Sequence, residues 1–555
     1  MNRMIIVSLS AFALAAQAAS LSSLPTVDLG YQVHRAISYN ETSGTYNFTN
    51  IPYAEPPLGS LRWRAPVPPR GVKQSVQDGS IGKICPQMSP NWTIVAQQFV
   101  EAWATGQFPL NFTEAETIAN NTPQPIDPRT TEDCLVLDVV VPKKVFDNQK
   151  QHGEQAPVVV WIYGGGWVSG TKESWGSPNG IISTTQEDGS DGIVWVAMNY
   201  RLGAFGFLAG PSLQADGTAN VGLHDQRLAL QWVRDNIAKF GGDPDNVTVM
   251  GQSAGSGSIM YHLLAHEGKR AVPFKRAIVQ SIPLTTLIDP AQQERNFQTF
   301  LSILNVTSLD EARRLPSSAL IAANIQQIGA APYNDFAFNP SVDNDYISGP
   351  PAPSLLKGCF AKNVPLLSSH TSYEGALFTD PRTIGNETAL AQTLRDVYPL
   401  ITEQDIGYAL NTLYPPVYNG SQPYTTDVDR EILMANEMYF AAAHQSLLQS
   451  TSHRGTEVYA WEFSVFPAIH GSDIPYTFYD GPTAGVDPHV ASIMQHAIAG
   501  FAKSGVPDAG PLGLASFPRY GKEATTIDLN VNSSVVISDP TWNNRTLWWA
   551  QATWA

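Results

Sequence analysis

A serine flanked by glycines constrains the fold of this 555-residue chain more than any other feature. The sequence G-Q-S-A-G at residues 251–255, with Ser253 at its centre, follows an apolar run at 247–250 and precedes a helical pattern over 256–265. A strand, a tight turn and a helix in this order expose the serine hydroxyl at the tip of the turn. Glycines are needed on both sides because a Cβ would clash in so tight a turn. A glycine-rich turn without chemistry is the alternative, but this context favours a nucleophile.

Short apolar runs predict the sheet that carries this turn. Three runs are apolar on both faces and two later stretches also have strand patterns; in chain order they are residues 158–162, 192–197, 247–250, 361–369 and 457–466. A helix is predicted from residue 222 to about 240, because apolar residues recur there at spacings of three and four. This alternation indicates an α/β fold with a mostly parallel central sheet flanked by helices. No flexible linker divides residues 19–555, so we expect them to form a single domain.

A triple glycine after the first of these strands suits the stabilisation of negative charge. Residues 163–167 read Y-G-G-G-W, so side chains do not block the approach to the backbone there. The N–H groups of Gly165, Gly166 and Ala254 would together form an oxyanion hole. A flexible turn is the alternative interpretation.

A serine on such a turn needs an acid and a histidine, which follow it in that order along the chain. Five histidines lie well downstream, at His444, His453, His470, His489 and His496. His470 is preferred because it lies in a loop directly after a predicted strand, and Glu374 is preferred among many acidic residues for the same reason. The pattern alone leaves the other candidates open.

The charge balance excludes some classes of partner. Lys and Arg total 33 against 49 Asp and Glu, a formal net charge of −16. A surface this acidic repels phosphate backbones and anionic lipid headgroups, so we expect no binding of nucleic acid.

The N-terminal residues 1–18 are typical of a secretory signal peptide. Arg3 precedes an apolar run that ends at A-Q-A, residues 16–18. No later stretch is long and apolar enough to span a membrane, so no stable membrane anchor is expected. Eleven N-x-S/T sequons are glycosylation candidates: Asn40, Asn47, Asn91, Asn111, Asn120, Asn246, Asn305, Asn386, Asn419, Asn532 and Asn544. We therefore expect a secreted, extracellular glycoprotein.

The three cysteines allow one disulfide. Cys85 and Cys134 could pair and leave Cys359 free, although three buried thiols are also consistent with the composition. The segment between Cys85 and Cys134 has no clear pattern of structure, and we interpret it as a long loop with exposed aromatic residues. Those aromatic residues are Trp92, Phe99, Trp103 and Phe108.

Several long sequence blocks are more specific than these patterns. They are I-P-Y-A-E-P-P-L-G-S-L-R-W at residues 51–63, E-D-C-L-V-L-D at 132–138, N-Y-R-L-G-A-F-G-F at 199–207, N-V-G-L-H-D-Q at 220–226 and G-Q-S-A-G at 251–255. On these blocks the chain resembles the type B carboxylesterase/lipase family, which includes cholinesterases and lipases of the Candida rugosa kind. The resemblance spans nearly the whole chain and implies the α/β-hydrolase fold.

The resemblance also implies roles for particular residues. The family nucleophile falls on Ser253, and its acid, in an E-G-x-x-F context, falls on Glu374. Its base, in an H-G-x-[DE] context, falls on His470. The oxyanion donors fall on Gly165, Gly166 and Ala254, and the family disulfide falls on Cys85 and Cys134.

Four departures from the family pattern concern the pocket. Gln252 stands where glutamate is common, Trp167 stands where phenylalanine is common, and residues 281–283 read S-I-P in place of S-G. The segment between Cys85 and Cys134 is longer than the lid of the lipases.

The resemblance implies a carboxylic ester hydrolase that acts on a small-molecule ester through an acyl-enzyme on Ser253, without a metal or organic cofactor. A triacylglycerol or sterol-ester lipase, with the segment from Cys85 to Cys134 as its lid, is one alternative. A non-catalytic cholinesterase-like binding protein is the other, although it would require the loss of a member of the triad.

Overall fold

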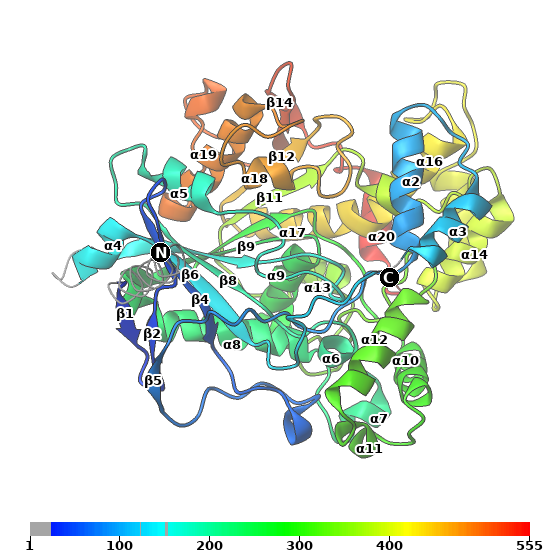
Figure 1. Ribbon diagram of the computed structural model, residues 1–555. Helices are drawn as coiled ribbons and strands as arrows, with labels where there is room; N and C mark the ends of the chain where they lie inside the picture. The colour runs from blue at the N-terminus through cyan, green and yellow to red at the C-terminus, as the bar shows by residue number, and fades with distance from the viewer. Residues whose placement is uncertain (1–23, 123, 150–153, 555) are drawn as a thin grey trace, which may run out of the picture.

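Eleven strands of the described chain form one large sheet. The computed structural model describes residues 24–122, 124–149 and 154–554, so the predicted signal peptide lies outside the described residues. The sheet has the order β14-β13-β12-β11-β10-β9-β7-β8-β6-β4-β3, and its seven strands from β13 to β8 pair in parallel. Antiparallel strands complete both edges (Figure 1).

The strands of this sheet are β3 (Ser38–Asn40), β4 (Thr45–Pro52), β6 (Val136–Pro142), β7 (Ala156–Ile162), β8 (Val194–Met198), β9 (Gly242–Gln252), β10 (Arg276–Gln280), β11 (Leu366–Thr371), β12 (Val458–Phe463), β13 (Thr525–Leu529) and β14 (Val535–Ser538). A small separate sheet contains β1 (Thr26–Asp28), β2 (Gln32–Arg35) and β5 (Lys73–Gln77). Each of the five predicted strands overlaps an observed one: β7, β8, β9, β11 and β12. Strands β8, β10 and β11 are buried at every position, as apolar runs covered on both faces must be.

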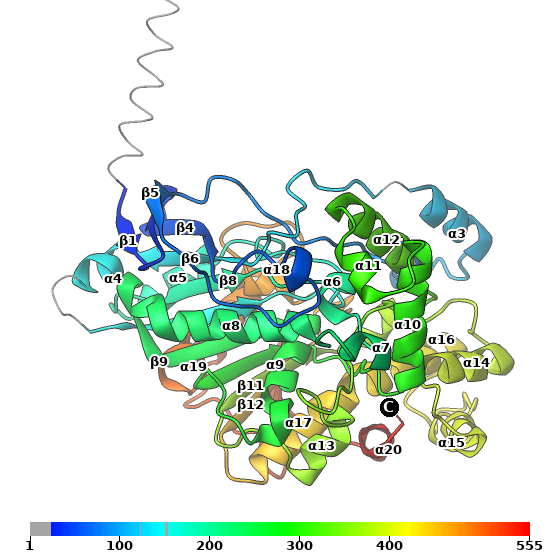
Figure 2. The ribbon, with the colours of Figure 1, turned by 90° about the horizontal axis from the view of Figure 1, so that it is seen from below.

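The described chain has α-helices on both faces of the large sheet and at one end of it. They are α2 (Trp92–Ala104), α3 (Phe112–Asn121), α4 (Lys143–Asn148), α5 (Asn179–Gln186), α6 (Gly203–Phe207), α7 (Pro211–Gln214), α8 (Val221–Asn236), α9 (Ala254–Leu264), α10 (Pro290–Ile303), α11 (Leu309–Arg313), α12 (Ser317–Gly329), α13 (Pro351–Lys357), α14 (Glu387–Val397), α15 (Glu403–Tyr408), α16 (Asp427–Asn436), α17 (Ala442–Ser452), α18 (Ile474–Thr477), α19 (Pro488–Ser504) and α20 (Asn544–Gln551). Helices α5 and α19 lie above the sheet in Figure 1, and α8 and α9 lie below it, nearest the viewer in Figure 2. One continuous hydrophobic core includes residues from Val27 to Ala552. None of the described helices is long and apolar enough to cross a membrane.

The segment between the two paired cysteines differs from its predicted loop. It contains helices α2 and α3, which gather with α12, α14 and α16 at one end of the sheet, on the right of Figure 1. The prediction of exposed aromatic residues was wrong for Trp92 and Phe99, which are buried. Residues 92, 95, 96, 99 and 100 are all buried on one face of α2, a helical spacing that the interpretation as a loop overlooked.

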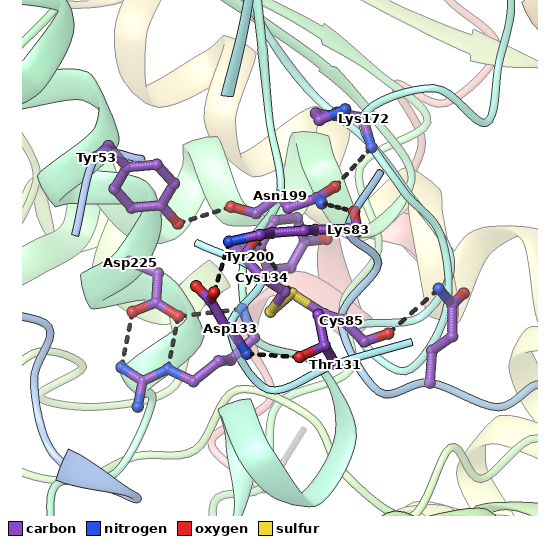
Figure 3. Close-up of a disulfide and its surroundings, with 12 residues drawn as sticks. Tyr53, Lys83, Cys85, Thr131, Asp133, Cys134, Lys172, Asn199, Tyr200 and Asp225 are labelled. Carbon is purple, nitrogen blue, oxygen red and sulfur yellow. Dashed lines mark hydrogen bonds and ion pairs between the residues drawn. A yellow bond between two sulfur atoms is a disulfide. The ribbon is translucent and has the colours of Figure 1, made fainter. Parts of the chain in front are cut away.

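A disulfide joins Cys85 to Cys134 and confirms the expected pairing. The bridge closes the base of the segment that contains α2 and α3, and Cys359 stays free. Around the bridge, Asn199 donates a hydrogen bond to the carbonyl of Lys83 and accepts one from the backbone of Lys172 (Figure 3). The base of the segment is therefore held by the disulfide and, through Asn199, by hydrogen bonds to the end of β8.

Candidate active site

Ser253 lies at the turn between β9 and α9, with strained backbone angles of φ 55° and ψ −128°. A Cβ added at Gly251 would lie 2.6 Å from the backbone of Gly255, and one added at Gly255 would lie 2.0 Å from the carbonyl of Ile162. Only glycine fits both positions, which explains the two glycines of the G-Q-S-A-G motif. The backbone N–H of Ser253 donates to the carbonyl of Gln280 at 2.9 Å, which fixes the turn against β10.

The structure brings Ser253, His470 and Glu374 together in one hydrogen-bonded chain. The Ser253 hydroxyl lies 2.7 Å from Nε2 of His470, and Nδ1 of His470 lies 2.5 Å from Oε2 of Glu374. These residues follow the parallel strands β9, β11 and β12 at their carboxyl ends, where open parallel sheets place their sites; β10 lies between β9 and β11. The other downstream histidine candidates, among them His444 and His496, form different contacts.

The environment of Glu374 keeps its carboxyl group charged. The side chain is fully buried, and burial alone would raise its pKa. The neighbouring His470 and a hydrogen bond from the backbone N–H of Thr371 outweigh burial, so the pKa of Glu374 is lowered below its usual value. A charged carboxylate holds the proton of His470 on Nδ1 and leaves Nε2 free to accept the serine proton.

Two of the three residues predicted for the oxyanion hole lie beside Ser253 in the same cavity. Gly166 and Ala254 line one cavity with Ser253, and Gly165 precedes Gly166 in the turn after β7. Gly165 and Gly166 have φ angles of 116° and 62°, and a Cβ at Gly166 would lie 2.3 Å from the ring of Phe336. The backbone can adopt this path only because side chains are absent.

The cavity beside Ser253, here called the catalytic cavity, is small and apolar. Its volume is about 20 Å³. Its apolar walls are formed by Trp167, Pro283, Phe336, Phe378 and Phe440. The indole of Trp167 donates a hydrogen bond to Ser258, and the rings of Phe378 and Phe440 pack against His470. Trp167 and Pro283, two of the departures from the family pattern, both line this space.

Helix α2 adjoins the catalytic cavity through aromatic contacts. The ring of Trp92 packs on Phe336 and Phe378, and its indole N–H donates to the carbonyl of Asp335 at 2.7 Å. A larger cavity, of about 610 Å³, lies on the outer side of Trp92. Two sequon residues, Asn91 and Asn120, line this outer cavity.

A second carboxyl group, that of Asp473, lies close to the triad, and the sequence singles it out only as the last residue of the H-G-x-[DE] motif. Asp473 is buried, and Oδ2 accepts a hydrogen bond from the amide of Gln280 at 2.9 Å. Burial and the negative charge of Glu374 raise the pKa of Asp473 to about 7. The motif H-G-x-[DE] identifies the residue, but its burial depends on the approach of β10, which no local pattern reveals.

One group of side chains among the described residues has metal-ligand spacing. His370, His444 and Asp539 are buried, and Nε2 of the two histidines lies 3.6 and 3.3 Å from the carboxylate. Burial lowers the pKa of His370, but the charges of Asp539 and Glu462 outweigh it and raise the value to about 9. A protonated His370 beside an ionised Asp539 balances the charge of this group without a metal ion.

Comparisons with known proteins agree with the geometry. The model of the carboxylesterase family matches residues 34–546. The chain is 39% identical over 552 residues to a protein of Penicillium expansum named carboxylesterase patB, and 40% identical over 549 residues to its namesake in Aspergillus clavatus; each match covers 96% of both chains. It is 32% identical to lipase 5 of Diutina rugosa, over 69% of this chain and 68% of that one.

Solved structures agree on the fold. EstA of Aspergillus niger superposes with a TM-score of 0.76 at 23% identity and covers 96% of this chain and 98% of its own. A PNB esterase superposes with a TM-score of 0.71 at 28% identity, over 93% of this chain and 98% of that chain. The chain therefore belongs to the carboxylesterase family of α/β-hydrolases, and it is a carboxylic ester hydrolase.

Proposed function

We propose that this protein is a secreted serine esterase that cleaves small carboxylic esters through an acyl-enzyme on Ser253. The observation that supports this proposal is the hydrogen-bonded chain from Ser253 through His470 to Glu374, which ends at the catalytic cavity. No step requires a metal or an organic cofactor.

In the first half of the reaction, Ser253 Oγ attacks the ester carbonyl while Nε2 of His470 takes its proton. The backbone N–H groups of Gly165, Gly166 and Ala254 donate hydrogen bonds to the oxyanion. When the tetrahedral intermediate collapses, the bond to the alcohol oxygen breaks and His470 gives its proton to that oxygen.

In the second half, water attacks the acyl carbonyl and His470 takes a proton from it. The bond to Ser253 Oγ then breaks, the serine regains its proton and the carboxylic acid leaves. Glu374 keeps the imidazole in the productive tautomer throughout.

A lipase is the second candidate, because α2 and α3 occupy the position expected of a lid. A lipase lid needs an exposed apolar surface that can bind lipid. The ring of Trp92 on α2 is instead buried against Phe336 and Phe378, which makes a lipase less favoured. The small volume of the catalytic cavity also favours short acyl groups over long ones.

The test is a series of p-nitrophenyl esters from acetate to palmitate, measured with the parent enzyme and with Ser253→Ala. We expect a maximum at short chains and a loss of about 10⁴–10⁶-fold in kcat in the variant. Ser504→Ala, at an exposed serine, serves as the matched control. A rise towards palmitate that steepens above the solubility limit would instead identify a lipase, and activity that survives in Ser253→Ala would refute the mechanism.

Secretion is part of the same proposal. Eight of the eleven sequon asparagines are exposed, and Asn47, Asn91 and Asn246 are half-buried. The amide oxygen of Asn246 accepts a hydrogen bond from Arg276 at 2.6 Å, which disfavours a glycan there. N-terminal sequencing and glycopeptide mapping of protein from the culture medium should show cleavage after Ala18 and glycans on exposed sites; intracellular, unglycosylated protein would refute this part.

A further inference from the structure

A second cavity adjoins the catalytic cavity and differs from it in chemistry. We call it the polar chamber; its volume is about 80 Å³, and Thr285, Asn334 and Tyr439 line both cavities. Asn339 and Tyr398 lie farther along its wall. The polar chamber is therefore the place that part of a substrate held at Ser253 would enter next.

Four residues that line the polar chamber each carry a buried polar atom that the protein does not satisfy. Oδ1 of Asn334, Oδ1 of Asn339 and the phenol oxygens of Tyr398 and Tyr439 have no hydrogen-bond partner in the described parts of the chain. Asn339, Tyr398 and Tyr439 are only 5%, 5% and 2% exposed. Because nearly all buried polar groups in proteins are paired, four unpaired atoms on one wall indicate a site that a ligand completes.

The chemistry of these four atoms specifies the ligand. Burial raises the pKa of Tyr398 and Tyr439 above the usual value, so both stay neutral phenols that can donate and accept hydrogen bonds. The two amide oxygens only accept. A hydroxyl group meets both needs, because it donates to an amide oxygen and accepts from a phenol.

The charges around the polar chamber narrow the class further. Asp335 and Asp396 lie in its wall, and no lysine or arginine does so among the described residues. Burial raises the pKa of Asp335, which favours its neutral form. An anionic substituent would find no cationic side chain there to offset its charge and would lie near the carboxyl groups of Asp335 and Asp396, so the site suits a neutral group.

We propose that the polar chamber is a specificity subsite for a neutral, hydroxyl-bearing part of the ester substrate. The preferred substrates are then compact hydroxylated esters, not esters of plain aliphatic chains. This inference rests on the proposed function, because it assumes that hydrolysis takes place at Ser253.

The test compares isosteric esters in which a hydroxyl replaces a methyl group. On the alcohol side the pair is 4-hydroxybutyl acetate and pentyl acetate; on the acyl side it is methyl 3-hydroxybutanoate and methyl 3-methylbutanoate. Hydrolysis is followed by pH-stat titration, and the readout is the ratio of kcat/KM within each pair. We expect the hydroxylated ester to be favoured at least about tenfold in one pair, since an analogue without the hydroxyl leaves the buried oxygens unpaired.

Two variants assign the preference to the polar chamber. Tyr398→Phe and Tyr439→Phe remove only the phenol oxygens and should lower the ratio about tenfold. A ratio measured within one variant cancels any general loss of activity or folded protein. Tyr408→Phe, at an exposed tyrosine outside the chamber, is the matched control and should leave the ratio unchanged.

The outcomes separate this inference from the function on which it rests. Equal kcat/KM within both pairs, with hydrolysis still abolished by Ser253→Ala, would overturn the inference and leave the esterase standing. A ratio that stays the same in both tyrosine variants would also overturn it. Faster hydrolysis of 3-(trimethylammonio)propyl acetate than of 4-hydroxybutyl acetate would replace the neutral class by a cationic one, and absence of Ser253-dependent hydrolysis of every ester would overturn both proposals.

Discussion

The turn that carries Ser253 and the segment that lies against it are held by different kinds of interaction. At the turn, backbone atoms approach so closely that Gly251 and Gly255 have no substitutes, and hydrogen bonds fix His470 and Glu374. In the segment, a disulfide closes the base, and aromatic packing of Trp92 fixes α2. The first region therefore depends on exact backbone geometry, whereas the second depends on buried apolar area, which tolerates change more gradually.

The largest expected effect comes from the catalytic region. Glu374→Gln keeps the shape of the buried side chain but removes the charge that holds the proton on Nδ1 of His470. We expect kcat to fall about 10⁴-fold, because the imidazole then prefers the unproductive tautomer. The measurement is kcat on p-nitrophenyl acetate, and Glu403→Gln at an exposed glutamate is the control. A loss of less than tenfold would mean that the carboxylate does not orient the base.

The next effect comes from the packing of the covering segment. Trp92→Ala removes a buried indole and leaves the carbonyl of Asp335 without its donor. We expect the free energy of unfolding to fall by about 3–5 kcal/mol, while kcat changes much less than in Glu374→Gln. Urea unfolding measures the stability, and kcat is measured on the same preparations. Trp92→Phe, which keeps most of the packing, is the control. If kcat fell as far as in Glu374→Gln, the two regions would not be separable.

The same contrast explains what the sequence could predict. The turn at Ser253 is local and demands particular residues, so a five-residue pattern in the right context located it and its neighbours in the sheet. Glu374 and His470 could be preferred only by their position after strands, and the family resemblance singled them out. The sequence predicts a loop where helix α2 lies, because the segment shows no clear pattern of structure, although the spacing of its buried residues is helical. The polar chamber could not be predicted, since its wall joins Thr285, Asn334, Tyr398 and Tyr439 through tertiary packing alone.

Removing the disulfide tests the contribution of the closed base of the segment separately from that of its aromatic contacts. The double variant Cys85→Ser/Cys134→Ser frees the ends of a loop whose cysteines are 49 residues apart. We expect it to be about 2–4 kcal/mol less stable, with kcat on p-nitrophenyl acetate nearly unchanged at a temperature where it stays folded. The free cysteine provides the control, because Cys359→Ser alters no bridge. Equal stability of the two variants would show that the bridge contributes nothing to the segment.

The smallest expected effect concerns the stability cost of a buried charge in the catalytic region, a cost that the segment does not have. The pKa of Asp473 is raised to about 7 by burial and by Glu374, above its usual value of 3.8. The folded state therefore binds this proton more tightly than the unfolded state. Stability from this group is fully present below about pH 4, falls as the pH rises towards 7, and stays low above it.

Asp473→Asn removes that dependence, because an amide does not ionise in this range. At pH 3, below the usual value of 3.8, the carboxyl group is mostly protonated in the folded and the unfolded chain alike, so the two proteins should differ almost only by their packing. At pH 8 the parent holds a buried carboxylate close to Glu374, and the variant should gain more than about 1 kcal/mol relative to it. Urea unfolding at several pH values measures the difference, and Asp480→Asn at an exposed site should give a difference that does not vary with pH. If the difference for Asp473→Asn were also independent of pH, Asp473 would ionise as readily in the folded protein as in the unfolded chain. The folded protein would then hold the carboxylates of Asp473 and Glu374 close together at no cost in stability.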